Sequence, residues 1–164
     1  MLKKYILCII LVFGLSLSGL SCATENCVFS NETISEKSFS DNKSVVLYQL
    51  FSKKNEVKGV LSNGNLFSVK YWSCSHYGKH SFMIIGPEMQ TIPDELNSQV
   101  ILLGGVSLNK EELKSLVKAI EKKPLKLSDL PIKLNISRDE FDEFYIQIGI
   151  AGEAIFVEIK LYKG

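Results

Sequence analysis

The last third of the chain carries the pattern that most constrains the fold, an alternation of apolar and polar side chains. Apolar residues recur at every second position in two neighbouring segments: Ile146, Ile148, Ile150, Ile155, Val157, Ile159 and Leu161. A two-residue period places alternate side chains on opposite faces of a β-strand. Because Gly152 lies between the two segments, we predict an antiparallel hairpin over 145–150 and 154–162 with one buried face.

Other segments are rich in β-forming residues and end at polar or glycine-containing turns. We predict strands over 44–52, 57–62, 66–72, 81–87, 100–106 and 131–136. The second and third of these flank Asn63-Gly64-Asn65, which is typical of a hairpin turn. The last begins with Pro131, which favours a position at the edge of the sheet because proline has no amide hydrogen to donate.

One segment has the features of an amphipathic helix. Asn109 is a good N-cap, and Glu112 stands three residues later, as in a capping box. Apolar residues follow at helical spacing until Pro124 ends the pattern. We therefore predict an α+β fold, with a mainly antiparallel sheet of about five to seven strands and one principal helix on one face. Residues 44–164 are expected to form a single domain.

The beginning of the chain has the three parts of a secretory signal peptide. Met1 to Lys4 is basic, Tyr5 to Leu17 is almost wholly apolar, and residues 18–23 are small. The apolar run is shorter than the roughly 20 residues that a membrane-spanning helix needs. We predict a signal peptide over residues 1–23, export from the cytoplasm and a periplasmic location.

Two cleavage chemistries fit the end of this segment. Small residues at Ser21-Cys22-Ala23 suit cleavage after Ala23, which would release a soluble protein. Gly19-Leu20-Ser21-Cys22 resembles a bacterial lipobox, although Gly19 stands where leucine is usual. That resemblance implies cleavage before Cys22, lipidation of its thiol and tethering to the outer membrane by the lipid. Both alternatives remain open from the sequence.

Cysteine usage fits an exported protein. Cys8 lies within the signal segment, and Cys22 is either removed or lipidated. Cys27 and Cys74 then remain as a pair, and in an oxidising compartment a pair of cysteines most simply forms a disulfide. The bridge would tie a polar, extended arm over 24–43 to the centre of the domain.

The charge balance argues against a nucleic-acid partner. The whole chain has a formal charge of +1, and the predicted signal peptide contains two of its 19 basic residues against 18 acids, so its loss leaves a charge of −1. Arg138 is the only arginine. Nucleic-acid surfaces need clustered positive charge, and arginine is the residue that best forms forked contacts with phosphates and bases.

The segment 71–80 contains the only tryptophan, both histidines and Cys74. We predict that residues 76–80 connect two strands and that side chains of the segment contact a protein partner, because tryptophan and tyrosine are enriched in interfaces. The predicted contact residues here are Trp72, His76, Tyr77, Lys79 and His80. Cys74, His76 and His80 could instead hold a metal, or Cys74 could act as a nucleophile. Since Cys74 is expected to pair with Cys27, we predict neither a metal nor a cofactor.

A second candidate contact surface is acidic. Its predicted members are Asp139, Glu140, Asp142 and Glu143. The spacing differs from that of a calcium-binding loop. We interpret the segment as a solvated turn able to dock a basic partner.

In size, export and architecture the chain resembles the small periplasmic inhibitors and immunity proteins that bacteria export against toxins and cell-wall-degrading enzymes. The resemblance implies a protein that is not an enzyme and that binds and occludes another protein, such as a toxin or a cell-wall-acting enzyme. Two alternatives are kept: a lipoprotein with a structural role in envelope assembly, and a small hydrolase that uses His76 or His80 with an acid from 139–143.

Overall fold

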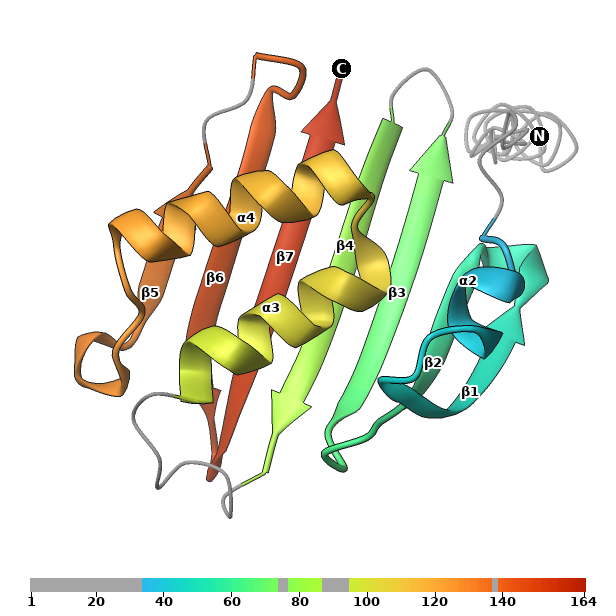
Figure 1. Ribbon diagram of the computed structural model, residues 1–164, viewed down its shortest axis with the longest axis horizontal. Helices are drawn as coiled ribbons and strands as arrows, with labels where there is room; N and C mark the ends of the chain where they lie inside the picture. Colours follow the sequence, from blue (N-terminus) through green and yellow to red (C-terminus); the bar gives the residue numbers. More distant parts are fainter. Residues whose placement is uncertain (1–33, 74–76, 87–94, 137–138) are drawn as a thin grey trace, which may run out of the picture.

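The computed structural model describes residues 34–73, 77–86, 95–136 and 139–164. These residues form a seven-stranded antiparallel sheet in the order β1-β2-β3-β4-β7-β6-β5 (Figure 1). The strands are β1 (Val45–Phe51), β2 (Glu56–Leu61), β3 (Leu66–Ser73), β4 (Tyr77–Ile85), β5 (Ile132–Asn135), β6 (Glu143–Ala151) and β7 (Ala154–Lys163). The predicted α+β class and the antiparallel sheet are confirmed.

Both predicted hairpins are present. The β2–β3 turn includes Gly64 with φ of 85°, and the β6–β7 turn includes Gly152 with φ of 64°, a conformation that glycine adopts without strain. The C-terminal strand β7 pairs with β4 on one side and with β6 on the other. The strand expected at 131–136 is confirmed as β5 at one edge of the sheet.

The prediction of a strand over 100–106 is wrong, because these residues belong to helix α3 (Glu95–Ser107). Leu96, Val100 and Leu103 lie at helical spacing and are buried. A Cβ atom on Gly104 would come within 2.6 Å of the Leu116 side chain, so this glycine lets the following helix approach closely. A helix that packs against both a sheet and a neighbouring helix is apolar on most sides, and its sequence therefore resembles that of a buried strand.

The principal helix of the prediction is α4 (Lys110–Lys122). Its capping box is present: Asn109 Oδ1 accepts hydrogen bonds from the amides of Glu111 and Glu112 at 3.0 and 2.9 Å, and a Glu112 carboxylate oxygen accepts from the Asn109 amide at 2.8 Å. The described chain thus has two 13-residue helices, where one principal helix was expected.

The described part of the N-terminal arm begins at Ile34 and contains a short helix, α2 (Lys37–Ser40). Phe39 of this helix is buried and lies 6.3 Å from Phe67 and 6.1 Å from Tyr48, measured between ring centroids. The Ile34 amide donates to Asn55 Oδ1 at 2.9 Å. These contacts hold the arm against the same face of the sheet that carries α3 and α4.

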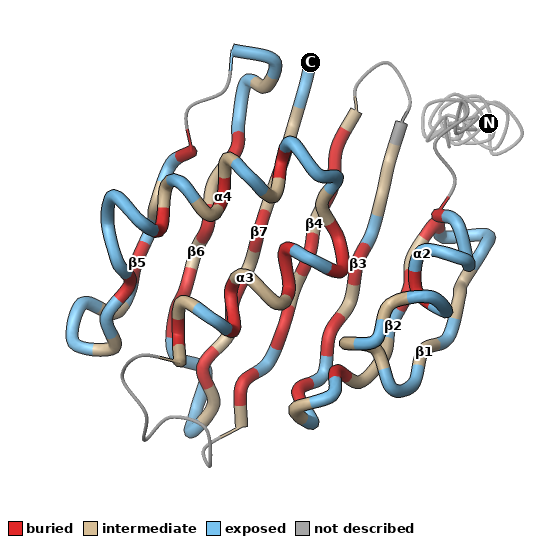
Figure 2. Tube along the Cα trace, viewed as in Figure 1, coloured by how far each residue is buried: buried red, intermediate tan, exposed pale blue. Residues whose placement is uncertain are grey.

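The hydrophobic core lies between the sheet and the helices (Figure 2). On the central strands every second side chain points into it: Phe67, Val69, Met83, Ile85, Ile155, Val157, Ile159 and Leu161. No helix of the described residues lies on the opposite side, which we call the open face (Figure 1). On β3, β4 and β7 the open face consists of Leu66, Ser68, Lys70, Trp72, Gly78, His80, Phe82, Ile84, Phe156, Glu158, Lys160 and Tyr162.

Candidate functional site

Several residues singled out by the sequence fall outside the described part of the chain. They are the candidate lipidation site Cys22, the predicted disulfide partners Cys27 and Cys74, and His76. The expected signal peptide over 1–23 also lies there. These expectations remain predictions.

The expectation that residues 76–80 connect two strands is wrong from Tyr77 onward. Tyr77, Gly78, Lys79 and His80 are the first four residues of β4, which begins four residues before the predicted start. Gly78 pairs with Trp72 and His80 pairs with Lys70 across β3. Strand alternation therefore sends neighbouring side chains of this segment to opposite faces of the sheet.

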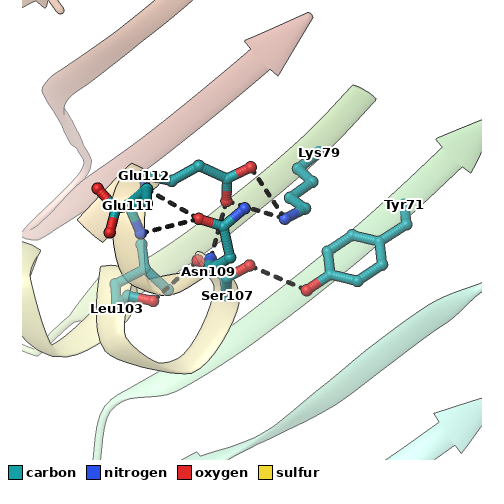
Figure 3. A network of polar contacts seen from close by, with 7 residues as sticks. All are labelled: Tyr71, Lys79, Leu103, Ser107, Asn109, Glu111 and Glu112. Atoms are coloured by element: carbon teal, nitrogen blue, oxygen red, sulfur yellow. Dashed lines mark hydrogen bonds and ion pairs between the residues drawn. The ribbon is translucent and has the colours of Figure 1, made fainter. Parts of the chain in front are cut away.

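Lys79 points inward and forms an ion pair with Glu112 of α4 (Figure 3). Its Nζ donates to both carboxylate oxygens, at 2.9 and 3.2 Å, and both side chains are buried. The ring centroids of Tyr71 and Tyr77 lie 5.2 and 5.5 Å from the ammonium, within the range of a cation–π contact. Lys79, predicted as a contact residue, is therefore buried in the packing between the sheet and α4.

The same region fixes the end of α3. The Tyr71 hydroxyl donates to the Ser107 carbonyl at 2.9 Å, and Ser107 Oγ donates to the Leu103 carbonyl at 2.9 Å (Figure 3). Because helix C-terminal carbonyls have no partner within the helix, the Tyr71 bond satisfies a group that would otherwise be unpaired. Tyr71 and Lys79, whose side chains point toward the helices, thus join β3 to α3 and β4 to α4.

Trp72 and His80 lie on the open face. A Cβ atom on Gly78 would come within 2.2 Å of the Trp72 ring, so the indole lies directly over the glycine of the neighbouring strand. His80 Nε2 lies 2.7 Å from a Glu158 carboxylate oxygen on β7, and both side chains are partly exposed. The acid beside His80 is therefore Glu158. The hydrolase alternative had instead expected an acid from residues 139–143 beside the histidine.

The predicted acidic residues gather around a hollow of about 530 Å³ at one end of the sheet. Asp139, Asp142 and Glu143 line it together with aromatic and strand residues: Lys133, Asn135, Ile136, Phe141, Phe144 and Tyr145. Asp139 and Asp142 are exposed. We call this hollow and the residues that line it the acidic end.

Hydrogen bonds and charges hold the acidic end in place. Asp142 Oδ2 accepts from the Gly164 amide at 2.6 Å. Glu143 lies 3.7 Å from Lys160 Nζ, and its side chain keeps about half of its surface exposed (52%). The Phe141 ring meets the buried Phe144 ring edge-on at 6.0 Å. The carboxylates therefore project from an ordered apolar base.

Tyr145 forms one wall of the hollow between two lysines. The Lys133 ammonium lies 4.3 Å from the ring centroid, and the Lys160 ammonium lies 5.9 Å from it. Such placement of a cation over an aromatic face is worth about 0.5–1 kcal/mol at an exposed site. The ring thus already binds cations of its own chain beside the acidic rim.

The two surfaces predicted from sequence lie at the same end of the sheet. Strand pairing places Trp72, Gly78, Tyr162 and Glu143 in one row across β3, β4, β7 and β6. Two strands, β4 and β7, therefore lie between Trp72 and Glu143 of the acidic end, which corresponds to about 14 Å at the usual strand spacing. Glu140 is exposed beside the hollow but is not among the residues that line it.

Three residues of these sites were not predicted from the sequence. Glu112 was recognised only as part of a cap, and its second role as the partner of Lys79 depends on how α4 lies over β4. Glu158 and Lys133 looked like ordinary solvent-facing strand residues. The only available signal was strand parity, because His80 and Glu158 lie on the same face once β4 and β7 are known to pair.

Among the described residues no group of three or more histidine, cysteine, aspartate or glutamate side chains is arranged to hold a metal ion. Within the same ranges no helix is long and apolar enough to cross a membrane. Compared with known proteins, the chain matches no protein-family model, no curated protein and no solved structure.

Proposed function

We propose that this chain is an exported protein of the bacterial cell envelope that binds another protein and occludes it, in the manner of periplasmic inhibitors and immunity proteins. The proposed location is the periplasm, with the protein either soluble or tethered to the outer membrane through a lipid on Cys22. The proposed partner is a toxin or a cell-wall-acting enzyme. No cofactor is required for this activity.

The observation that carries the proposal is the acidic end. A hollow of about 530 Å³ with Asp139, Asp142 and Glu143 around it offers carboxylates to a basic side chain, and Phe141 offers it apolar contact. Interfaces combine an aromatic centre with a charged rim in this way. We therefore expect the occluded protein to present a basic, protruding loop.

Rim charges mainly control how fast two proteins associate and which partners are rejected. The acidic end has carboxylates exposed to solvent at its rim, and Trp72 extends the surface along the same end of the sheet. An occluding protein gains from fast association because it must act before its target does. A strong dependence of the association rate on ionic strength is expected for this reason.

Affinity capture from envelope extracts tests the proposal. The bait is the protein expressed from the full-length chain, and the retained proteins are identified by mass spectrometry. The variant Asp139→Asn/Asp142→Asn/Glu143→Gln removes the rim charges, and we expect it to lose the retained partner. The control Glu111→Gln/Glu121→Gln/Asp129→Asn removes three exposed acids elsewhere and should retain it.

Two results contradict the proposal. One is that no protein is retained above background by the unmodified bait. The other is that the acidic-end variant and its control retain the same partner equally well. The variant His76→Ala/His80→Ala provides a further check, because a binding protein keeps its partner after this change whereas a histidine-dependent hydrolase loses nearly all turnover.

A further inference from the structure

Strand pairing arranges the open face in rows that cross the sheet. The row nearest the β2–β3 turn is apolar and runs over five strands: Leu47, Val60, Leu66, Ile84 and Phe156. The next row contains Gln49, Lys58, Ser68, Phe82, Glu158 and Gln147. The third row contains Phe51, Glu56, Lys70, His80, Lys160 and Tyr145.

Three of the five residues in the apolar row are exposed to solvent, and Val60 and Phe156 are partly exposed. Leu47 has 65% of its surface exposed, Leu66 has 56% and Ile84 has 39%. Phe156 lies over Gly149 of β6 and stacks with Phe82 at a centroid distance of 6.1 Å, which extends the apolar surface into the next row. A contiguous apolar patch of this kind on a folded protein indicates a surface that another molecule covers.

The charged residues on the two sides of the open face are arranged in opposite order. On β2, Glu56 stands in the third row and Lys58 in the second. On β7, Lys160 stands in the third row and Glu158 in the second. A two-fold axis parallel to the strands, between β3 and β4, would bring β2 of one copy over β7 of another. Each glutamate would then face a lysine in the same row.

The uncharged residues match under the same rotation. Strand β3 would face β4 of the second copy, which brings Leu66 over Ile84. Strand β2 would face β7, which brings Val60 over Phe156. Strand β1 would face β6, which brings Phe51 over Tyr145 and Gln49 over Gln147. Lys70 would face His80 and Ser68 would face Phe82, and neither of these two pairs adds opposite charges or contact between two apolar side chains.

We propose that the open face binds a second copy of this chain and forms a two-fold symmetric dimer, with the sheets packed face to face. A two-fold interface uses the same surface on both subunits and must be complementary to itself. Paired sheets in β-sandwiches pack in this manner with aligned strands. The order of charges and apolar residues on the open face meets that requirement.

The available area is sufficient for a specific dimer. Six strands and three rows cover about 29 Å by 20 Å at the usual strand spacing and residue rise, or on the order of 600 Å² per copy. The pair would bury roughly 1,200 Å², which lies at the lower end of the range for specific interfaces. Strand β5 has no counterpart in this arrangement, so Lys133, Asn135 and the acidic turn remain accessible, whereas Tyr145 and Lys160 become part of the dimer interface.

The mixed signs of charge favour a second copy over a membrane surface. Membrane-binding surfaces present lysine and arginine to anionic lipids. The three rows of the open face contain Glu56 and Glu158 beside Lys58, Lys70 and Lys160, so an anionic surface would meet repulsion as well as attraction. Glu56, Glu158, Lys58 and Lys160 each have an opposite charge in the same row of a second copy.

Sedimentation equilibrium of the protein purified from cells that express the full-length chain tests the dimer. We expect a reversible monomer–dimer equilibrium. Leu66→Asp places a charge in the apolar row at a residue that is exposed in the monomer. Because the dimer is two-fold symmetric, the charge enters the interface from both copies. We expect it to raise the dimer dissociation constant by at least about tenfold. The matched control is Ile150→Asp, because Ile150 is also exposed (65%) but lies outside the three rows.

Charge reversal tests the register. Lys58→Glu places like charges opposite each other and should weaken the dimer by about tenfold or more. Adding Glu158→Lys in the same chain restores opposite charges across the two-fold axis and should return the dissociation constant to within about threefold of the original. The pair Glu56→Lys and Lys160→Glu should behave in the same way.

Three outcomes overturn the proposal. The first is a protein that stays monomeric up to millimolar concentration. The second is a dimer that survives Leu66→Asp, which would place the interface elsewhere, for example at the β1 edge. The third is a dimer that Lys58→Glu weakens but Glu158→Lys does not rescue. Circular dichroism of each variant shows whether it is folded. If Leu66→Asp fails to fold, a folded, monomeric Lys58→Glu variant still allows the restoration of the dimer by Glu158→Lys to be tested.

Discussion

Lys79 on β4 and Glu112 on α4 form a buried ion pair in which the lysine ammonium donates to both carboxylate oxygens, at 2.9 and 3.2 Å. Only 7% and 2% of the two side chains is exposed. The same carboxylate accepts the Asn109 amide and so closes the capping box of α4. One side chain therefore fixes both the start of the helix and its position over the sheet.

Replacing one member of this pair is predicted to destabilise the fold strongly. Lys79→Met leaves an unpaired buried carboxylate and should lower the free energy of unfolding by about 3–5 kcal/mol. Adding Glu112→Gln removes the uncompensated charge and keeps an acceptor for the Asn109 amide, so the double variant should recover part of the loss. Urea denaturation measures the free energy of unfolding of the single and the double variant. Lys118→Met, an exposed lysine on α4, is the control and should change stability by less than about 0.5 kcal/mol. A single variant as stable as this control would show that the pair contributes little.

Gly78→Ala is predicted to displace the Trp72 ring. The added Cβ would lie 2.2 Å from the ring, which forces the indole or the strand to move. We expect a cost of about 1–3 kcal/mol and a shift of the tryptophan emission, which reports this site alone because Trp72 is the only tryptophan. Gly105→Ala has open space around its Cβ and lies in a helix, so it should stabilise the protein by up to about 1 kcal/mol without an emission change. Unchanged tryptophan emission in Gly78→Ala would contradict the packing of the Trp72 ring over Gly78.

Asn109→Ala is predicted to weaken the start of α4. The substitution removes the oxygen that accepts the Glu111 and Glu112 amides, and loss of such a cap costs about 1 kcal/mol. Asn109→Asp keeps an acceptor at the same position and should stay within a few tenths of a kcal/mol of the original protein. Thermal unfolding followed by circular dichroism distinguishes the two. Equal losses in both variants would point to another role for Asn109.

The predicted Cys27–Cys74 disulfide is tested by thiol titration of the unreduced, exported protein. We expect neither cysteine to react before reduction. Reduction should then lower stability by up to about 4 kcal/mol, the value that the chain-entropy relation gives for a loop of this length. Reaction of both thiols without reduction would remove the bridge and reopen the metal and nucleophile alternatives at Cys74.

Much of the fold was predictable because its signals are local. The alternation around Ile146 to Leu161 reflects burial of one face of a strand, and the Asn109–Glu112 box depends on residues three apart. Helix α3 could not be recognised in the same way. Its continuous apolar run, including Gly104, arises because it lies against both the sheet and α4, and sequence alone does not distinguish that environment from a buried strand.

The same distinction between local and tertiary signals applies to the candidate sites. The sequence alone determined that Trp72, His80 and the acids from Asp139 to Glu143 were unusual, since residue type and spacing are visible in one dimension. Only the tertiary structure decided that Lys79 turns inward, that His80 meets Glu158, and that the acids surround a hollow. The physical reason is that a strand sends successive side chains to opposite faces, so the role of each depends on which face the helices cover and which strands become neighbours.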